Sequence, residues 1–158
     1  MKIFIGTDHA GFELKEELKR FLEDSGCEVK DLGAYEFNDT DDYPDFIFPV
    51  VEAVAKDIAR GLDSRGIVIG GSGQGEAIVA NKVKSIRAAV VYDEYSAKMS
   101  REHNDANIIS LGSRTLDISK AKQLVKLWLE TPFSNEERHI RRIEKIKAIE
   151  GNNFKIHV

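Results

Sequence analysis

Residues 67–76 read Ile67-Val68-Ile69-Gly70-Gly71-Ser72-Gly73-Gln74-Gly75-Glu76, an apolar β-branched stretch that runs into a glycine-rich turn. The apolar part predicts a buried strand, and the turn ends in a carboxylate where a helix is expected to begin. The glycines lack a Cβ atom, so the backbone can adopt unusual dihedral angles and bring its N–H groups close to a ligand. Together with the helix N-terminus, these N–H groups predict a site for negative charge.

Two familiar glycine loops do not fit this turn. The dinucleotide-binding fingerprint needs glycines at i, i+2 and i+5, but counted from Gly71 the third position is Glu76. A nucleoside-triphosphate loop ends in Gly-Lys-Ser/Thr, whereas Gly75 is followed by Glu76 and Ala77. A plain turn without a ligand stays open as the alternative, although three alternating glycines are more than such a turn needs.

Glu76 and Ser72 add chemistry to the predicted anion site. A carboxylate beside N–H donors combines a base with groups that stabilise a developing oxyanion, which suits proton transfer next to a carbonyl group. The combination indicates an enzyme. In the alternative interpretation, Glu76 only complements the dipole of the following helix.

The composition describes an ordinary globular protein. The 158 residues, 42% of them hydrophobic and 32% charged, are enough for one domain with a proper core. No stretch approaches the roughly 20 apolar residues that span a bilayer, and the first strand pattern is too short for a signal peptide. The single Cys27 excludes an internal disulfide and suits a reducing cytosol, so we expect a cytoplasmic protein. The net charge of −4 argues against broad nucleic-acid binding.

Strand-length apolar runs alternate with helix-period segments along the chain. We expect strands at Lys2–Gly6, Glu28–Leu32, Gly66–Gly70, Ala88–Tyr92 and Ile108–Leu111. Helices are expected over 14–22, 46–58, 78–83, 95–102, 118–129 and 136–150, with Pro44 at the entrance of the second. This alternation predicts an α/β fold, a Rossmann-like three-layer sandwich with a five-stranded parallel sheet and a C-terminal helix. Residues 1–150 should form one domain, followed by a tail over 151–158.

Ligands of open parallel sheets bind at the carboxyl ends of the strands, so the residues that follow each strand are candidates for a site. They are Thr7-Asp8-His9-Ala10-Gly11, the glycine loop, the helix ending in His103-Asn104-Asp105, and Gly112-Ser113-Arg114. We expect these acid, imidazole, amide and guanidinium groups to gather at one edge. No set of His, Cys and carboxylate residues has the spacing of metal ligands, so no essential metal is expected.

A series of short segments in fixed order carries a family resemblance. The segments are Gly6-Thr7-Asp8-His9-Ala10-Gly11-Phe12, Asp42-Tyr43-Pro44, Gly71-Ser72-Gly73-Gln74-Gly75, Ala80-Asn81-Lys82, Ile86-Arg87-Ala88, His103-Asn104-Asp105-Ala106-Asn107, Gly112-Ser113-Arg114 and Arg138-His139. Over nearly its full length the chain resembles ribose-5-phosphate isomerase type B and the related galactose-6-phosphate isomerase subunits. The resemblance implies a cofactor-free aldose–ketose isomerase of pentose phosphate metabolism. It also implies a homodimer, or a tetramer, with active sites at the subunit interface and a small sugar phosphate as ligand.

The chain departs from many members of that family at the end of the third strand. Those members carry a catalytic cysteine at the position of Gly70. Another branch, similar to actinobacterial members, lacks the cysteine and places a glutamate just after the glycine loop, where Glu76 stands. Cys27 precedes the second strand, and we interpret it as a core or helix-end residue.

The resemblance implies a role for each candidate residue near the glycine loop. Glu76 would remove the proton from C2 of the open-chain sugar, and the backbone N–H groups of 71–75 would stabilise the enediolate. Ser72 would shuttle a proton between the sugar oxygens. Substrate contacts are expected from Gly71, Gly73, Gln74 and Gly75.

Further roles fall on residues outside the loop. His103 would donate the proton that opens the sugar ring, since imidazole can act as an acid near neutral pH. Asn104 would bind a sugar hydroxyl or the enediolate, Asp8 the sugar ring and His9 the phosphate. Tyr43 is expected near the substrate. From the residues alone, His103 could equally interact with a helix dipole, and Asp8 could be a helix N-cap.

The phosphate group needs local cations. Arg138 and Arg142 are four residues apart on the last predicted helix and can project from one face, and Arg114 is the third candidate. Guanidinium groups suit phosphate because they present paired donors.

Two other functions stay open. A six-carbon sugar phosphate, such as galactose or allose 6-phosphate, would need only a longer pocket. A non-catalytic phosphate-binding module on the same fold is the other alternative, although a passive anion binder has no use for Glu76 beside its anion site.

Overall fold

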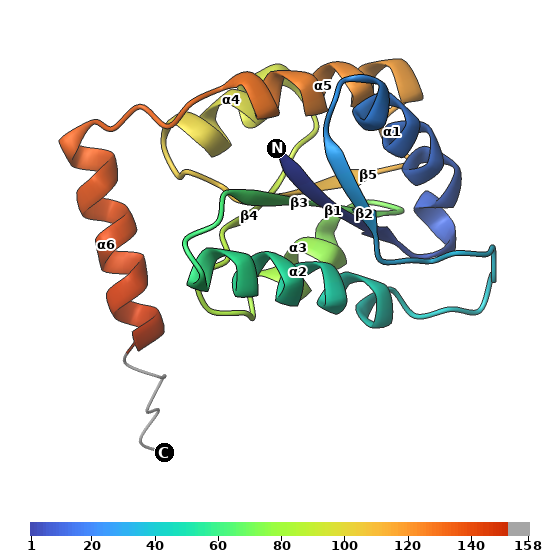
Figure 1. The fold of residues 1–158 in the computed structure, drawn as a ribbon, viewed down its shortest axis with the longest axis horizontal. Coiled ribbons are helices and arrows are strands. Elements are labelled where there is room, and N and C mark those ends of the chain that lie inside the picture. Colours follow the sequence, from blue (N-terminus) through green and yellow to red (C-terminus); the bar gives the residue numbers. More distant parts are fainter. Residues whose placement is uncertain (152–158) are drawn as a thin grey trace.

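Five parallel strands form the middle layer of the protein in a computed structural model, which describes residues 1–151 (Figure 1). The strands are β1 (Lys2–Thr7), β2 (Glu28–Asp31), β3 (Ser64–Gly70), β4 (Ala88–Val90) and β5 (Ile108–Gly112), in the order β2-β1-β3-β5-β4. Every residue of the central strand β3 is buried, as expected for a strand covered on both faces. The predicted α/β fold with a five-stranded parallel sheet is confirmed.

Helices cover both faces of this sheet. They are α1 (Phe12–Asp24), α2 (Tyr43–Ala59), α3 (Gln74–Ala80), α4 (Glu94–Glu102), α5 (Ile118–Glu130) and α6 (Glu137–Gly151), with a short 3₁₀ helix η1 (His9–Gly11) before α1. Helices α1, α4 and α5 lie over one face, and α2 and α3 over the other (Figure 1). Alternate residues of each strand point to opposite faces, so Ile67 packs into the first core and Val68 into the second.

The observed bounds of most elements differ from the predicted ones by a few residues, and two of these differences have identifiable reasons. Helix α3 begins at Gln74 rather than Ile78, because Gly73 adopts a left-handed conformation (φ 79°) and already starts the helical turn. This early start places Glu76 in the first turn. Strand β4 ends at Val90 rather than Tyr92, because the backbone N–H groups of Tyr92 and Asp93 donate to the Ser96 hydroxyl in the capping box of α4.

Helix α6 stands apart from the three layers (Figure 1). His139 and Ile143 on this helix are buried, while Ile140, Ile146 and Ile149 are large apolar residues exposed to solvent. Gly151 is the last residue of α6, and residues 152–158 of the expected tail lie outside the described part of the chain. Among the helices of residues 1–151, none combines the length and the apolar character needed to cross a membrane.

The outer edge of β4 is occupied by a side chain. The Asn81 side-chain amide donates to the Ala88 carbonyl oxygen at 2.9 Å and accepts from the Ala88 N–H group at 2.9 Å. Asn81 directly follows α3 and thus ties the end of that helix to the edge of the sheet.

Candidate active site

A cleft of about 370 Å³ opens at the carboxyl ends of the strands. Strand β1 leads through α1 to β2 on one side, and β2 leads through α2 back to β3 on the other, so the strand order reverses between β1 and β3. Ligands of open α/β sheets bind at such a reversal. The cleft is lined by Asp8, His9, Ala10, Tyr43, Gly71, Ser72, Gly75, Glu76, Arg114 and Thr115.

The glycines of the loop make room for specific neighbours. A Cβ atom on Gly70 would lie 1.8 Å from Oε1 of Glu76, so the carboxylate rests directly against the end of β3. A Cβ atom on Gly75 would lie 2.8 Å from the Tyr43 ring. On Gly71 it would lie 3.3 Å from the Arg114 guanidinium. The close approach of three cleft-lining side chains to the backbone explains why the loop has more glycines than a turn requires.

Glu76 has the environment of a general base. Its side chain is buried, with the residue only 4% exposed, although it lines the cleft. Burial raises the pKa of Glu76, and the nearby Asp8 carboxylate raises it further, whereas a hydrogen bond with the Glu76 backbone lowers it. The net direction is upward, toward the neutral range in which a base is most effective.

The loop and the strand ends hold the other cleft residues in place. Ser72 is exposed and its hydroxyl accepts from the Gln74 N–H group at 3.3 Å. Asp8 is the N-cap of η1, where its Oδ1 accepts from the Ala10 N–H group at 3.0 Å. The structural role that the sequence left open for Asp8 is therefore real, and its carboxylate still lines the cleft.

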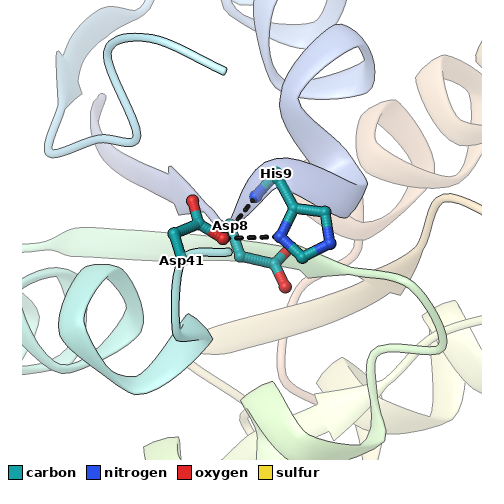
Figure 2. A group of neighbouring side chains, drawn as sticks. All are labelled: Asp8, His9 and Asp41. Carbon is teal, nitrogen blue, oxygen red and sulfur yellow. Dashed lines mark hydrogen bonds and ion pairs between the residues drawn. The ribbon is translucent and has the colours of Figure 1, made fainter. Parts of the chain in front are cut away.

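His9 is paired with a residue that the sequence analysis missed. Oδ1 of Asp41 lies 2.6 Å from Nδ1 of His9 and 3.1 Å from the His9 backbone nitrogen (Figure 2). Asp41 precedes α2 in a segment with several other acidic residues, and no spacing in the sequence distinguishes it from them. Its role depends on the loop after β2 returning to the end of β1, which only the fold reveals.

Asp8, His9 and Asp41 also have oxygen and nitrogen atoms within 4.8 Å of one another, as a small cation site would (Figure 2). Two atoms that share a tetrahedral metal at about 2.1 Å lie about 3.4 Å apart. The 2.6 Å contact between Asp41 and His9 is shorter and has the length of a charge-assisted hydrogen bond. We therefore interpret the group as a hydrogen-bonded pair beside Asp8 and not as a set of metal ligands.

The remaining predicted residues lie elsewhere on the chain. His103 is the C-cap of α4, and its ring stacks on the ring of His139 with centroids 4.2 Å apart. Asn104 follows it, and its carbonyl oxygen accepts from Arg87 at 2.7 Å. The expectation that His103 and Asn104 gather at the same edge as Glu76 is wrong within a single chain. Helix α4 carries the chain back along the sheet, so that Asn107 then bonds to Gly66 near the start of β3.

Arg138 and Arg142 lie close to His103 and Asn104 rather than in the cleft. Both lie on α6 beside His139, where each lowers the pKa of that histidine, after the larger effects of burial and of His103. The basic side chains in the cleft of one chain are thus His9 and Arg114. The α6 group, defined as His103, Asn104, Arg138 and Arg142, supplies none of the cleft lining.

The comparisons with known proteins agree with one another. The family model described as Ribose/Galactose Isomerase matches residues 3–146. A solved structure of ribose-5-phosphate isomerase B from Clostridium thermocellum is 49% identical, with a TM-score of 0.89, over 96% of this chain and 99% of that one. Ribose-5-phosphate isomerase B from Mycoplasma genitalium, solved with bound ribulose 5-phosphate, is 39% identical, with a TM-score of 0.90. The match covers 95% of this chain and 96% of that one. A D-erythrulose-4-phosphate isomerase of Mycolicibacterium smegmatis is 40% identical over 96% of this chain and 98% of its own length.

Proposed function

The chain belongs to the ribose/galactose isomerase family, and from this membership we propose that it interconverts ribose 5-phosphate and ribulose 5-phosphate. The observation that carries the proposal is the buried Glu76 carboxylate beside the glycine loop, in the cleft at the strand reversal. A base of raised pKa next to backbone N–H donors is what an enediolate mechanism requires.

In the proposed reaction, Glu76 takes the C2 proton of the open-chain aldose and returns it to C1 of the enediolate. The backbone N–H groups of 71–75 stabilise the negative oxygen, an effect worth about 3–4 kcal/mol for a well-placed donor. Ser72 moves a proton between the O1 and O2 oxygens, and Asp8 binds a hydroxyl of the sugar. No metal or organic cofactor takes part in this scheme, since the loop itself stabilises the oxyanion. Glu76 thus acts where many relatives use a cysteine at the position of Gly70.

We further propose that the active enzyme is a homodimer, in which the α6 group of one subunit completes the cleft of the other. Two observations support it. The basic side chains of the cleft lining are His9 and Arg114, and the α6 group contains His103, Arg138 and Arg142, the residues expected to supply the ring-opening acid and further cations for the phosphate. Helix α6 stands off the three layers (Figure 1). It exposes isoleucines that a second copy would bury. A tetramer of such dimers is compatible with the same sites.

The first experiment is a ribose 5-phosphate isomerisation assay in the presence of a chelator. We compare the wild type with Glu76→Gln and with the control Glu52→Gln, which removes an exposed carboxylate of α2. We expect activity in the wild type and the control, and a kcat on the order of 10²–10⁴-fold lower in Glu76→Gln. Near-normal turnover in Glu76→Gln would remove the glutamate from the mechanism.

The dimeric site has its own test. Glu76→Gln and His103→Asn should each be inactive alone, since each disables one half of every site. Refolding an equal mixture should restore about a quarter of the wild-type activity, because half of the randomly paired dimers have one intact site. No recovery in a mixture that contains dimers by light scattering would refute sites shared between subunits.

Substrate length is the finer question. The relative named for erythrulose 4-phosphate shows that proteins about equally similar to this chain differ in the sugar in their names. The five-carbon substrate is favoured by the crystal structure of a relative with ribulose 5-phosphate. We expect kcat/KM to be highest for ribose 5-phosphate among four-, five- and six-carbon aldose phosphates. A higher value for allose or galactose 6-phosphate would reassign the substrate, and inactivity with all of them would favour a phosphate-binding module.

A further inference from the structure

Asp41 has no part in the mechanism above, yet its carboxylate binds both the backbone and the ring of His9, which lines the cleft. Its Oδ1 accepts two hydrogen bonds from one residue, from the backbone N–H group of His9 and from the Nδ1 atom of the same histidine. The Asp41 side chain is only 6% exposed. Its second oxygen, Oδ2, is buried without a hydrogen-bond partner among the described residues. Because both hydrogen bonds of this buried carboxylate come from His9, we infer that Asp41 positions that histidine.

The geometry fixes the orientation of the imidazole ring. The two bonds to Oδ1 hold both the backbone and Nδ1 of His9 on the Asp41 side, so Nδ1 must carry a proton. The other ring nitrogen, Nε2, points away from Asp41 (Figure 2). Because the His9 side chain is partly exposed and lines the cleft, Nε2 is the atom that a ligand can meet. A carboxylate on one ring nitrogen also makes the other more basic, as in carboxylate–histidine pairs at metal sites.

The groups around His9 favour its charged form. Two carboxylates face the ring, those of Asp8 and Asp41, and one cation, Arg114, opposes them. The hydrogen bond to Asp41 has the largest effect and raises the pKa of His9, burial lowers it, and the charges of Asp8 and Asp41 add to the rise. When it is protonated, His9 adds a second positive group to the cleft beside Arg114.

We propose that Asp41 is a positioning residue for substrate phosphate, which keeps His9 doubly protonated with its Nε2–H directed into the cleft. This inference rests on the proposed function, because it assumes that a phosphorylated ligand enters the cleft. It explains how an acidic chain with Asp8 and Glu76 in its cleft can attract a dianion. A neutral histidine would offer a weaker hydrogen bond and no charge.

The first test does not depend on turnover. A proton NMR titration of the histidine ring signals, with the His9 signal identified by its loss in His9→Asn, measures the ionisation of that ring directly. We expect a wild-type pKa above the ordinary value of about 6.5 and a fall in Asp41→Asn. The control Asp42→Asn changes the adjacent exposed acid and should leave the His9 pKa unchanged. A wild-type His9 pKa at or below the ordinary value would overturn the proposal, even if Asp41→Asn did not fold.

The second test is a double-mutant cycle in the isomerase assay. If Asp41 acts through His9, Asp41→Asn should raise KM on the order of tenfold at pH 8 with little change in kcat. In the His9→Asn background the same substitution should add nothing. An additional loss in that background, or a loss in kcat rather than KM, would assign Asp41 a merely structural role. Inorganic phosphate, added as a ligand in the NMR titration, should raise the pKa of His9 further in the wild type and not in Asp41→Asn. If the wild type proved to lack isomerase activity, the proposed function would fail while the titration and phosphate results still decided the role of Asp41.

Discussion

Replacing Gly70 by alanine should disable the protein by moving a residue six positions away. A Cβ atom at residue 70 would lie 1.8 Å from Oε1, 2.2 Å from Cδ and 2.7 Å from Oε2 of Glu76. Ordinary contact between carbon and oxygen begins near 3.4 Å, so the carboxylate would have to retreat by about 1.6 Å. A misplacement of 1 Å in a reacting group costs about 10²-fold in rate. We therefore expect kcat to fall on the order of 10²–10³-fold.

The fold should survive this change. Gly70 does not have a positive φ angle, so its backbone conformation is open to alanine. Glu76 lines the cleft, so its carboxylate can rotate into the cleft and away from the new Cβ atom. The free energy of unfolding should therefore fall by only about 1–2 kcal/mol. Urea denaturation measures this cost, and ketose formation at saturating ribose 5-phosphate measures kcat.

Two further variants distinguish the loss of Glu76 as a base from the steric clash at residue 70. Gly70→Ala combined with Glu76→Ala removes the clashing carboxylate, so it should recover stability without recovering activity. Gly151→Ala is the matched control, because a Cβ atom there meets nothing within 4 Å. If Gly70→Ala kept a kcat within about threefold of the wild type, the position of Glu76 would not determine the rate and the reasoning would be refuted.

Two more predictions concern stability. Asp31→Asn should lower the free energy of unfolding by about 3 kcal/mol in urea, because it breaks the 2.6 Å pair with the fully buried Lys15; a loss as small as that of Glu52→Gln, which breaks an exposed pair, would contradict this. For His139, burial and the stacked His103 lower the pKa, so the unfolded chain takes up the proton first and stability should fall as the pH drops through about 6.5. His139→Phe keeps the ring without the charge and should lose less stability than the wild type between pH 7.5 and pH 5.5; equal losses in both proteins would show that His139 does not titrate in this range.

The sheet and most helices could be predicted because their signals are local. The β-branched run at 67–69 and the spacing of Leu14, Leu18 and Leu22 report strand and helix directly, and both segments bury these residues as expected. The start of α3 could not be predicted from periodicity, since the helix begins on Gln74 and Gly75 without an apolar residue. Its start depends on the left-handed Gly73, whose conformation no apolar pattern encodes.

The residues of the candidate site also differ in how well the sequence predicts their positions. Asp8 and Arg114 lie within two residues of a strand end, and Glu76 follows the short loop after β3, so the rule that ligand-binding residues lie at the carboxyl ends of parallel strands places all three in one cleft. His103 follows a whole helix rather than a strand, and the rule fails for it because α4 runs back across the sheet. Asp41 lies in a long loop, where only tertiary packing decides which acid meets His9. Local rules thus find residues fixed by strands and miss those fixed by loops.

The amide of Asn81 has a consequence for how the protein stays in solution. An open strand edge invites another chain to add a strand, and continued addition leads to fibrous aggregates. On β4 the outward N–H and C=O groups of Ala88 are already taken by a side chain that imitates the peptide group of a sixth strand. The remaining free edge is too short to template an incoming strand, because β4 has only three residues. Asn81 therefore acts as a stop on sheet growth at the β4 edge.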